Sequence, residues 1–235
     1  MKEKILIADK KRRMFIASFK LSVLGMLFFA LSLKAYAYDD GDFQVWHTEN
    51  QEMKINKESK LTLEEEFRFG DNANDFYYHH YDIGFVRDLS KYLNLGIGYR
   101  HIYEKKSGKF KEEMEPYGMA TLFWELVGFK FDSRSRLEYR HFDYQLDAWR
   151  YRNKFNMKFP WKFTKMQIQP FLADEIFLNL NGIDLNQNRF YSGLGFNLTK
   201  NIKGEIYYLL QSTKSSGTCV WTDINVLGTK FKVLF

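Results

Sequence analysis

The sequence has little of several residue types, and each shortage excludes a class of protein. Its 235 residues include one cysteine and three prolines. A single cysteine excludes a scaffold built on disulfide bonds. After the N-terminal region, no apolar run approaches the roughly 18 residues that indicate a transmembrane helix. The chain is nevertheless long enough for one domain with a buried core.

Net positive charge is also lacking once the N-terminal region is set aside. The formal net charge is +6, and residues 1–37, with eight basic and two acidic side chains, account for all of it. The remaining residues are neutral overall. This balance argues against nucleic acid as a partner, because nucleic-acid binding needs a basic surface.

Residues 1–37 have the parts of a cleavable secretory signal. A basic stretch precedes the apolar residues 21–33, a run too short to span a membrane, which takes roughly 20 residues. Ala35 and Ala37 then place small residues at the two positions that a signal peptidase reads. We therefore expect cleavage after Ala37, with an uncleaved anchor as the alternative.

This interpretation gives two regions, a signal peptide at 1–37 and one domain at 38–235. The signal predicts export through the inner membrane. No cysteine follows the apolar run closely, so a lipid anchor is not indicated. Met14 follows a basic cluster and is an alternative start of the chain.

Alternation of apolar and polar residues dominates the domain. In 92–104, for example, Leu95 and Ile97 alternate with Gly96 and Gly98. Side chains of a strand point alternately to opposite faces, so such segments have one apolar and one polar face. The pattern predicts eleven strands, at about 43–55, 59–69, 76–88, 92–104, 113–125, 128–142, 148–159, 166–178, 188–199, 202–212 and 220–234.

The connections between these strands alternate in predicted length. Strands of this length suit a tilted membrane crossing of about 9–11 residues, whereas soluble strands average about 5–6. We therefore expect an all-β fold, an antiparallel transmembrane β-barrel of ten to twelve strands with short periplasmic turns and longer extracellular loops. The alternative is a soluble β-sandwich or lipocalin-like barrel with inward apolar faces. Short turns are predicted near Lys57, Ser90, Leu126, Phe163 and Asn201, and long loops at 70–75, 105–112, 143–147, 179–187 and 213–219.

Two details conflict with a simple barrel. Single-chain bacterial barrels normally have an even number of strands. Either 43–55 lies outside the wall, which leaves ten strands, or one strand has been missed, which gives twelve. Glu65 and Asp174 share the apolar parity of their strands. Because a carboxylate facing lipid is unfavourable, we expect a bulge or register shift near each of them.

The C-terminus carries a sharper signal. Phe231, Val233 and Phe235 share one parity, and the chain ends on Phe235. A terminal aromatic residue with apolar partners at two-residue steps resembles the sorting signal of Gram-negative outer-membrane barrels. It predicts recognition by the barrel assembly machinery, an outer-membrane location and contact with outer-membrane lipid.

Several segments resemble one family. They are LTLEEEFRFGDN (61–72), LNLGIGYRHIYE (93–104), RLEYRHFDY (136–144) and WRYRNKFNMKF (149–159), with Trp46 near the expected mature start. This succession is similar to the outer-membrane barrels grouped as domain of unknown function 2490. The resemblance implies a barrel fold and an outer-membrane location, and it implies no activity.

Residues with catalytic or metal-binding chemistry are few. His79 and His80 are adjacent, so they face opposite sides of a strand and do not share a metal. Cys219 has no cysteine partner for a metal site. Ser133 and Ser135 lie too far from His141 for a single-strand site, although a cross-strand triad stays open. We expect no metal, no cofactor and no enzyme activity, with a lipid-acting enzyme, either a phospholipase or a lipid A modifier, as the alternative.

Five arginines fall on the polar parity, and we name them the arginine belt. They are Arg68, Arg100, Arg140, Arg152 and Arg189. We expect the belt in the outer half of the lumen, where acids of the same parity either pair with it and plug the barrel or leave a mouth that attracts a small anionic solute. The acids are Glu64, Glu66, Glu138 and Glu175.

The predicted function is therefore a narrow or gated small-solute channel, or a barrel with a mainly structural role. Barrels of about eight strands are filled by side chains, and water-filled porins need about 16–18 strands. A barrel of ten to twelve strands falls between these cases. The sequence leaves the oligomeric state open.

Overall fold

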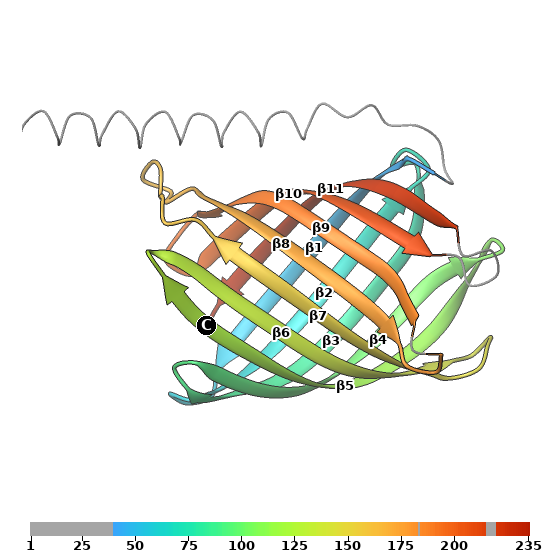
Figure 1. The fold of residues 1–235 in the computed structure, drawn as a ribbon, viewed down its shortest axis with the longest axis horizontal. Coiled ribbons are helices and arrows are strands. Elements are labelled where there is room, and N and C mark those ends of the chain that lie inside the picture. Colours follow the sequence, from blue (N-terminus) through green and yellow to red (C-terminus); the bar gives the residue numbers. More distant parts are fainter. Residues whose placement is uncertain (1–39, 183, 215–219) are drawn as a thin grey trace, which may run out of the picture. The chain divides into compact units, whose positions relative to one another are not determined.

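Eleven strands close into one barrel in the computed structural model, which describes residues 40–182, 184–214 and 220–235 (Figure 1). No helix in this described part is long and apolar enough to cross a membrane. The predicted signal peptide, with Ala35 and Ala37, lies outside the described residues, as does Cys219. The strands are β1 (Asp42–Lys54), β2 (Ser59–Gly70), β3 (Asp75–Ser90), β4 (Leu93–Lys106), β5 (Lys109–Leu126), β6 (Phe129–Phe142), β7 (Ala148–Lys158), β8 (Gln169–Asn179), β9 (Asp184–Asn197), β10 (Ile202–Lys214) and β11 (Trp221–Leu234).

Closure of the barrel joins β1 to β11 in parallel, whereas all other neighbouring strands are antiparallel. Asp42–Glu52 pairs with Ile224–Leu234 along this seam. An odd number of alternating strands leaves the first and last strands running in the same direction, so they pair in parallel. The all-β barrel class is thus confirmed, within the predicted ten to twelve strands. Both ways of reaching an even number were wrong, because β1 is in the wall and the described residues contain no twelfth strand.

The barrel has two ends, which we call distal and proximal. The distal end holds the connections β2–β3, β4–β5, β6–β7, β8–β9 and β10–β11, and the proximal end holds the others and Phe235. The predicted division into short proximal turns and long distal loops is wrong. The proximal end carries a long connection at 159–168, and the distal end carries a two-residue turn at Ser107 and Gly108. Both turn residues have positive φ, of 50° and 79°, as a tight type I′ hairpin requires.

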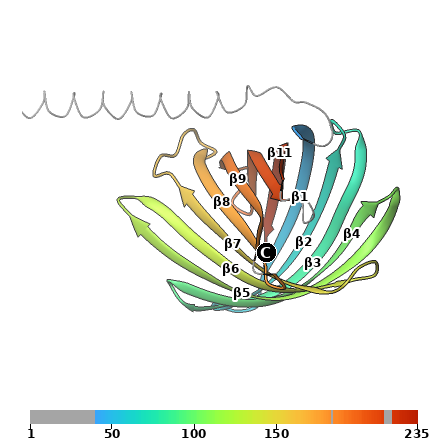
Figure 2. The same ribbon diagram turned by 45° about the vertical axis from the view of Figure 1, so that its right-hand side comes forward.

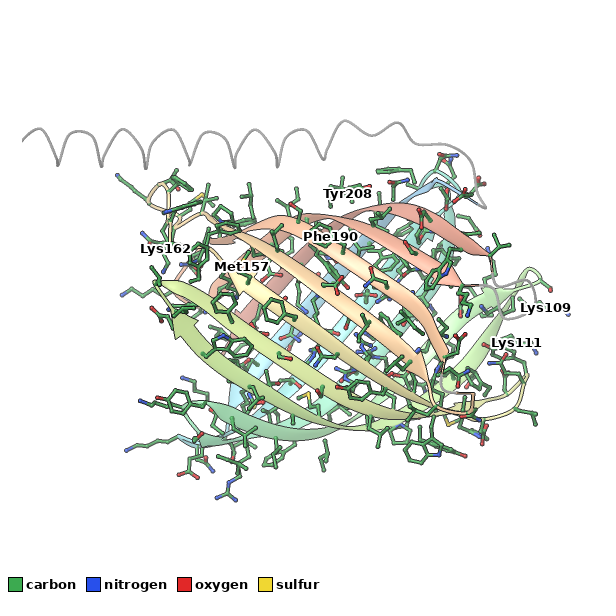
Figure 3. All side chains as sticks on the ribbon, in the orientation of Figure 1. Lys109, Lys111, Met157, Lys162, Phe190 and Tyr208 are labelled. Atoms are coloured by element: carbon green, nitrogen blue, oxygen red, sulfur yellow. The ribbon has the colours of Figure 1, made fainter. Side chains whose placement is uncertain are left out.

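The wall separates two sets of side chains by parity, as the sequence predicts. Figure 3 shows Met157, Phe190 and Tyr208 pointing away from the barrel, with Lys109 and Lys162 marking its distal and proximal ends. Nitrogen and oxygen atoms gather behind the front strands, within the barrel. Polar and charged side chains therefore face the lumen, and apolar ones form most of the outer face.

Part of the lumen is filled by an apolar cluster. Its residues come from β8, β9, β10, β11 and β1, which are successive neighbours in the barrel; Figure 2 labels β8, β9, β11 and β1 on this side of the wall. Glycine makes room for its rings, because a Cβ at Gly228 would come within 2.1 Å of the Tyr207 ring. The cluster consists of Trp46, Phe171, Ala173, Tyr191, Tyr207, Leu209 and Val226.

Glu65 and Asp174 stay on the outer face, contrary to the expected shifts. The register of β2 changes only between Arg68 and Phe69, beyond Glu65. The register between β8 and β9 changes only between Phe177 and Leu178. Asp174 is instead accommodated in place, because Asn188 Nδ2 donates a hydrogen bond to its carboxylate at 2.9 Å.

Candidate functional site

A cavity of about 810 Å³ occupies the lumen and is lined by residues of all eleven strands. Its lining includes Gln44 and Thr213 near the distal end, and Lys60 and Lys203 near the proximal end. The lining is rich in charged side chains because the polar parity of each strand faces inward. The cavity lining therefore includes residues from both ends of the barrel, and it is largely ionic.

All five residues of the arginine belt line this cavity. Each of them lies within 4.0 Å of a carboxylate, so the belt is neutralised from within the barrel. The nitrogen–oxygen distances are 2.6 Å for Arg68 with Glu66, 3.0 Å for Arg100 with Asp82, 2.7 Å for Arg152 with Glu175 and 4.0 Å for Arg189 with Glu175, and Arg140 donates to Glu113 at 2.9 Å.

Glu175 is the centre of the densest part of this network. Its side chain is 1% exposed, and Arg152 donates two hydrogen bonds to one carboxylate oxygen at 2.7 and 3.0 Å. The Tyr191 hydroxyl donates to the other oxygen at 2.9 Å. Arg134 and Arg189 lie within 4.0 Å as well. One buried carboxylate therefore compensates several cations that come from three different strands.

Trp46 links the belt to the apolar cluster. The Arg68 guanidinium lies 3.7 Å from its ring centroid, and the Arg189 guanidinium lies 4.9 Å away. The indole nitrogen donates to Gln44 at 2.9 Å. Guanidinium groups over an indole face are attracted by the ring quadrupole. Trp46 thus holds two belt arginines, from β2 and β9, close together.

Comparison with models of known protein families assigns the chain to a family. Residues 43–222 match the profile described as "Protein of unknown function (DUF2490)". The chain belongs to the DUF2490 family. The match runs from β1 to the first residues of β11, so it covers nearly all of the barrel and confirms the resemblance seen in the sequence. No curated protein matches the chain.

Cations outside the belt also face the lumen of this DUF2490 barrel, and four of them, on β6 and β7, were not among the predicted site residues. They share the parity of Arg140 and Arg152, and that parity was the signal that could have revealed them. The missed residues are Arg134, Arg136, Arg150 and Lys154.

Sequence reasoning placed the histidines of β3 correctly. His80 lies in the lumen, 2% exposed, where its ring is 3.0 Å from the Tyr78 hydroxyl. His79 points outward and stacks on Tyr103 at 4.7 Å. The two rings therefore face opposite sides. Within the described residues, no group of three potential metal ligands is found.

The serines and histidine of β6 form no site. Ser135 contacts the Tyr151 hydroxyl and Asn153, and His141 contacts Asp147 at 3.0 Å. A cross-strand arrangement does occur at the seam, on the outer face. Thr229 Oγ1 lies 2.8 Å from His47 Nδ1, and His47 Nε2 lies 3.3 Å from Glu49. Hydroxyl, imidazole and carboxylate thus follow one another as in a nucleophile with its base and an orienting group.

The C-terminal residues complete the seam. The backbone nitrogen of Phe235 donates to the carbonyl of Glu52 at 2.9 Å, and Lys54 donates to the carbonyl of Phe235 at 3.3 Å. The Phe235 side chain is 65% exposed on the outside. The last residue therefore adds two hydrogen bonds to the parallel pairing and presents an aromatic ring at the proximal rim.

Proposed function

We propose that this protein is a barrel of the Gram-negative outer membrane that conducts small solutes through a narrow, charged lumen. The observation that carries the proposal is the cavity of about 810 Å³, whose lining reaches both ends of the barrel. With eleven strands the barrel lies between filled barrels of about eight strands and open porins of about 16–18. The ionic network narrows the passage further, so the solutes are small.

The outer face supports the membrane location. Ile97 and Ile83 are 66% and 50% exposed on it, as residues in contact with lipid would be. Aromatic side chains gather at both ends, as in the aromatic girdles of membrane barrels. The distal group includes Phe67, Phe69, Phe76, His79, Tyr103 and Phe110, and the proximal group includes Trp124, Phe129, Phe131, Phe155, Phe159 and Trp161.

Reconstitution into planar bilayers tests conduction. Folding is first established by a gel on which the unboiled barrel migrates differently from the boiled one. We expect small single-channel currents from the folded protein and none from the boiled protein. Folded protein without current would contradict the channel and leave the structural barrel, which would instead copurify with a partner.

A lipid-acting hydrolase is the second candidate function, and the triad Thr229–His47–Glu49 supports it. The neighbourhood of the triad departs from the apolar pattern, because Glu49 and Glu65 form a cross-strand pair on the outer face. In the proposed reaction His47 takes the hydroxyl proton, and Thr229 attacks a lipid ester. The alcohol leaves with that proton, and water then releases the fatty acid. The channel is better supported than the hydrolase, because residues of all eleven strands line the cavity.

Fatty-acid release from phospholipid vesicles tests the hydrolase. We expect Thr229→Ala to abolish any release, and Ser135→Ala to retain it, since Ser135 also faces outward but has no histidine partner among the described residues. Absence of release by the folded wild-type barrel, or equal release by the Thr229→Ala variant, would exclude this site.

A further inference from the structure

The lumen contains a cluster of cations that the carboxylates of the barrel do not satisfy. Arg134 faces Lys154 directly across β6 and β7, and Arg136 faces Arg152 one step along. Like charges directly opposite each other destabilise a sheet. Arg152 is compensated by Glu175 at 2.7 Å and Glu138 at 3.2 Å. Arg134, Arg136 and Lys154 are compensated far less, and we call these three the cationic cluster.

Arg136 shows most directly that the hydrogen-bond donors of the cluster are not all satisfied. Its side chain is 5% exposed, and its Nε and Nη1 atoms are buried without a hydrogen-bond partner. Glu138 and Asp82 lie 3.6 and 3.9 Å from Nη1, close enough for attraction and too far for a hydrogen bond. A buried guanidinium with free donors is costly unless an acceptor is supplied. The ring of Tyr117, 3.9 Å away, supports its face and supplies no acceptor for these donors.

The other two members leave room for a ligand. Arg134 has a carboxylate only at 3.9 Å, and its side chain is 33% exposed toward the cavity. The Lys154 ammonium lies 3.5 Å from the Tyr191 ring centroid and has no carboxylate oxygen within 4.0 Å among the described residues. All three side chains line the same cavity. The acids within 4.0 Å of Arg134 and Arg136 are Glu175, Glu138 and Asp82. Each of them already binds another arginine at 3.0 Å or less.

We propose that the cationic cluster is a binding site for a small oxyanion of the phosphate or carboxylate class. Planar guanidinium groups match the paired oxygens of such anions, and Lys154 adds a third charge. The oxyanion would accept the free hydrogen bonds of Arg136 and separate Arg134 from Lys154. In the proposed channel this site makes anions the favoured solutes. Only this preference for anions rests on the proposed function, because binding of an oxyanion to the cluster can be measured without any transport.

Thermal unfolding of the folded full-length chain in detergent tests binding, with inorganic phosphate as the probe and sodium chloride at equal ionic strength as reference. We expect phosphate to raise the melting temperature saturably. In Arg134→Gln with Lys154→Gln, the apparent affinity for phosphate should fall about tenfold, which corresponds to about 1.4 kcal/mol. Lys158→Gln is the control, because Lys158 lines the same lumen nearer the proximal end.

A second measurement stays informative if phosphate has a weak effect on stability. Without phosphate, Lys154→Gln should raise the melting temperature, because it relieves the repulsion of Arg134. No phosphate effect beyond that of chloride, or an equal effect in the double variant, would overturn the site. Phosphate binding by a barrel that carries no current would leave the site standing and refute the channel. Current without phosphate binding would do the reverse.

Discussion

Glu175→Gln removes the charge on which the centre of the lumen network depends. The substitution keeps the size of the side chain and one acceptor for Arg152. It leaves the charges of Arg152, Arg134 and Arg189 without their shared carboxylate. Loss of one partner of a buried ion pair costs about 3–5 kcal/mol. Because the cavity admits water beside the network, we expect the lower end, about 3 kcal/mol of the free energy of unfolding.

Urea-driven unfolding in phospholipid vesicles measures this loss by tryptophan fluorescence, with the gel shift reporting the folded fraction. Glu205→Gln is the matched control, since Glu205 also faces the lumen and has no ion pair among the described residues, and it should change stability by about 0.5 kcal/mol or less. Adding Arg152→Gln to Glu175→Gln should restore part of the loss, with a coupling of about 1–3 kcal/mol. Equal stabilities of the Glu175→Gln and Glu205→Gln variants would refute the assigned network.

Three further predictions concern the ends of the chain and a distal loop. Deletion of Phe235 should lower the yield of folded barrel in the outer membrane more than a similar change within 213–219, because Phe235 makes two seam hydrogen bonds; equal yields would count against this. N-terminal sequencing of the protein recovered from the outer-membrane fraction should begin at Tyr38, and an intact 1–37 would contradict cleavage. Hydrogen bonds from His141 and Tyr139 lower the pKa of Asp147 to about 2. At a pH above about 4, the ordinary pKa of an aspartate, the ionised Asp147 therefore stabilises the fold. This contribution is lost as the pH falls through about 2. Asp147→Asn should flatten the stability profile between about pH 4 and pH 2, and an unchanged profile would refute the contact.

Much of the wall could be predicted from the sequence, because alternation of side chains is a local property. The strand around Leu95 and Ile97 and the inward direction of the arginine belt both follow from a period of two. The turn at Ser107 and Gly108 was mistaken for a long loop, because its flanking lysines look like loop residues. They belong to β4 and β5 and continue past the apolar part of the wall. Composition alone does not distinguish a polar strand end from a loop.

Closure and the site depend on contacts between distant segments, which periodicity does not encode. The parallel pairing of β1 with β11 is decided by the total number of strands. The importance of Arg136 depends on which carboxylates reach it from β3 and on the acceptors already taken by Arg150 and Arg152. Parity places Arg134 and Lys154 in the lumen, but only the register shows that they face each other.

Accessibility of two adjacent residues on β10 tests most directly the proposal that the barrel spans a membrane and has an open lumen. Glu205 faces the lumen, and Ile206, 43% exposed, faces outward. Glu205→Cys and Ile206→Cys, each in a Cys219→Ser background, are treated in proteoliposomes with a charged maleimide that does not enter lipid. We expect rapid labelling at position 205 through lumen water, and labelling at position 206 only after the barrel is unfolded. Rapid labelling at position 206 in the folded protein, with protection at 205, would contradict both the membrane location and the open lumen.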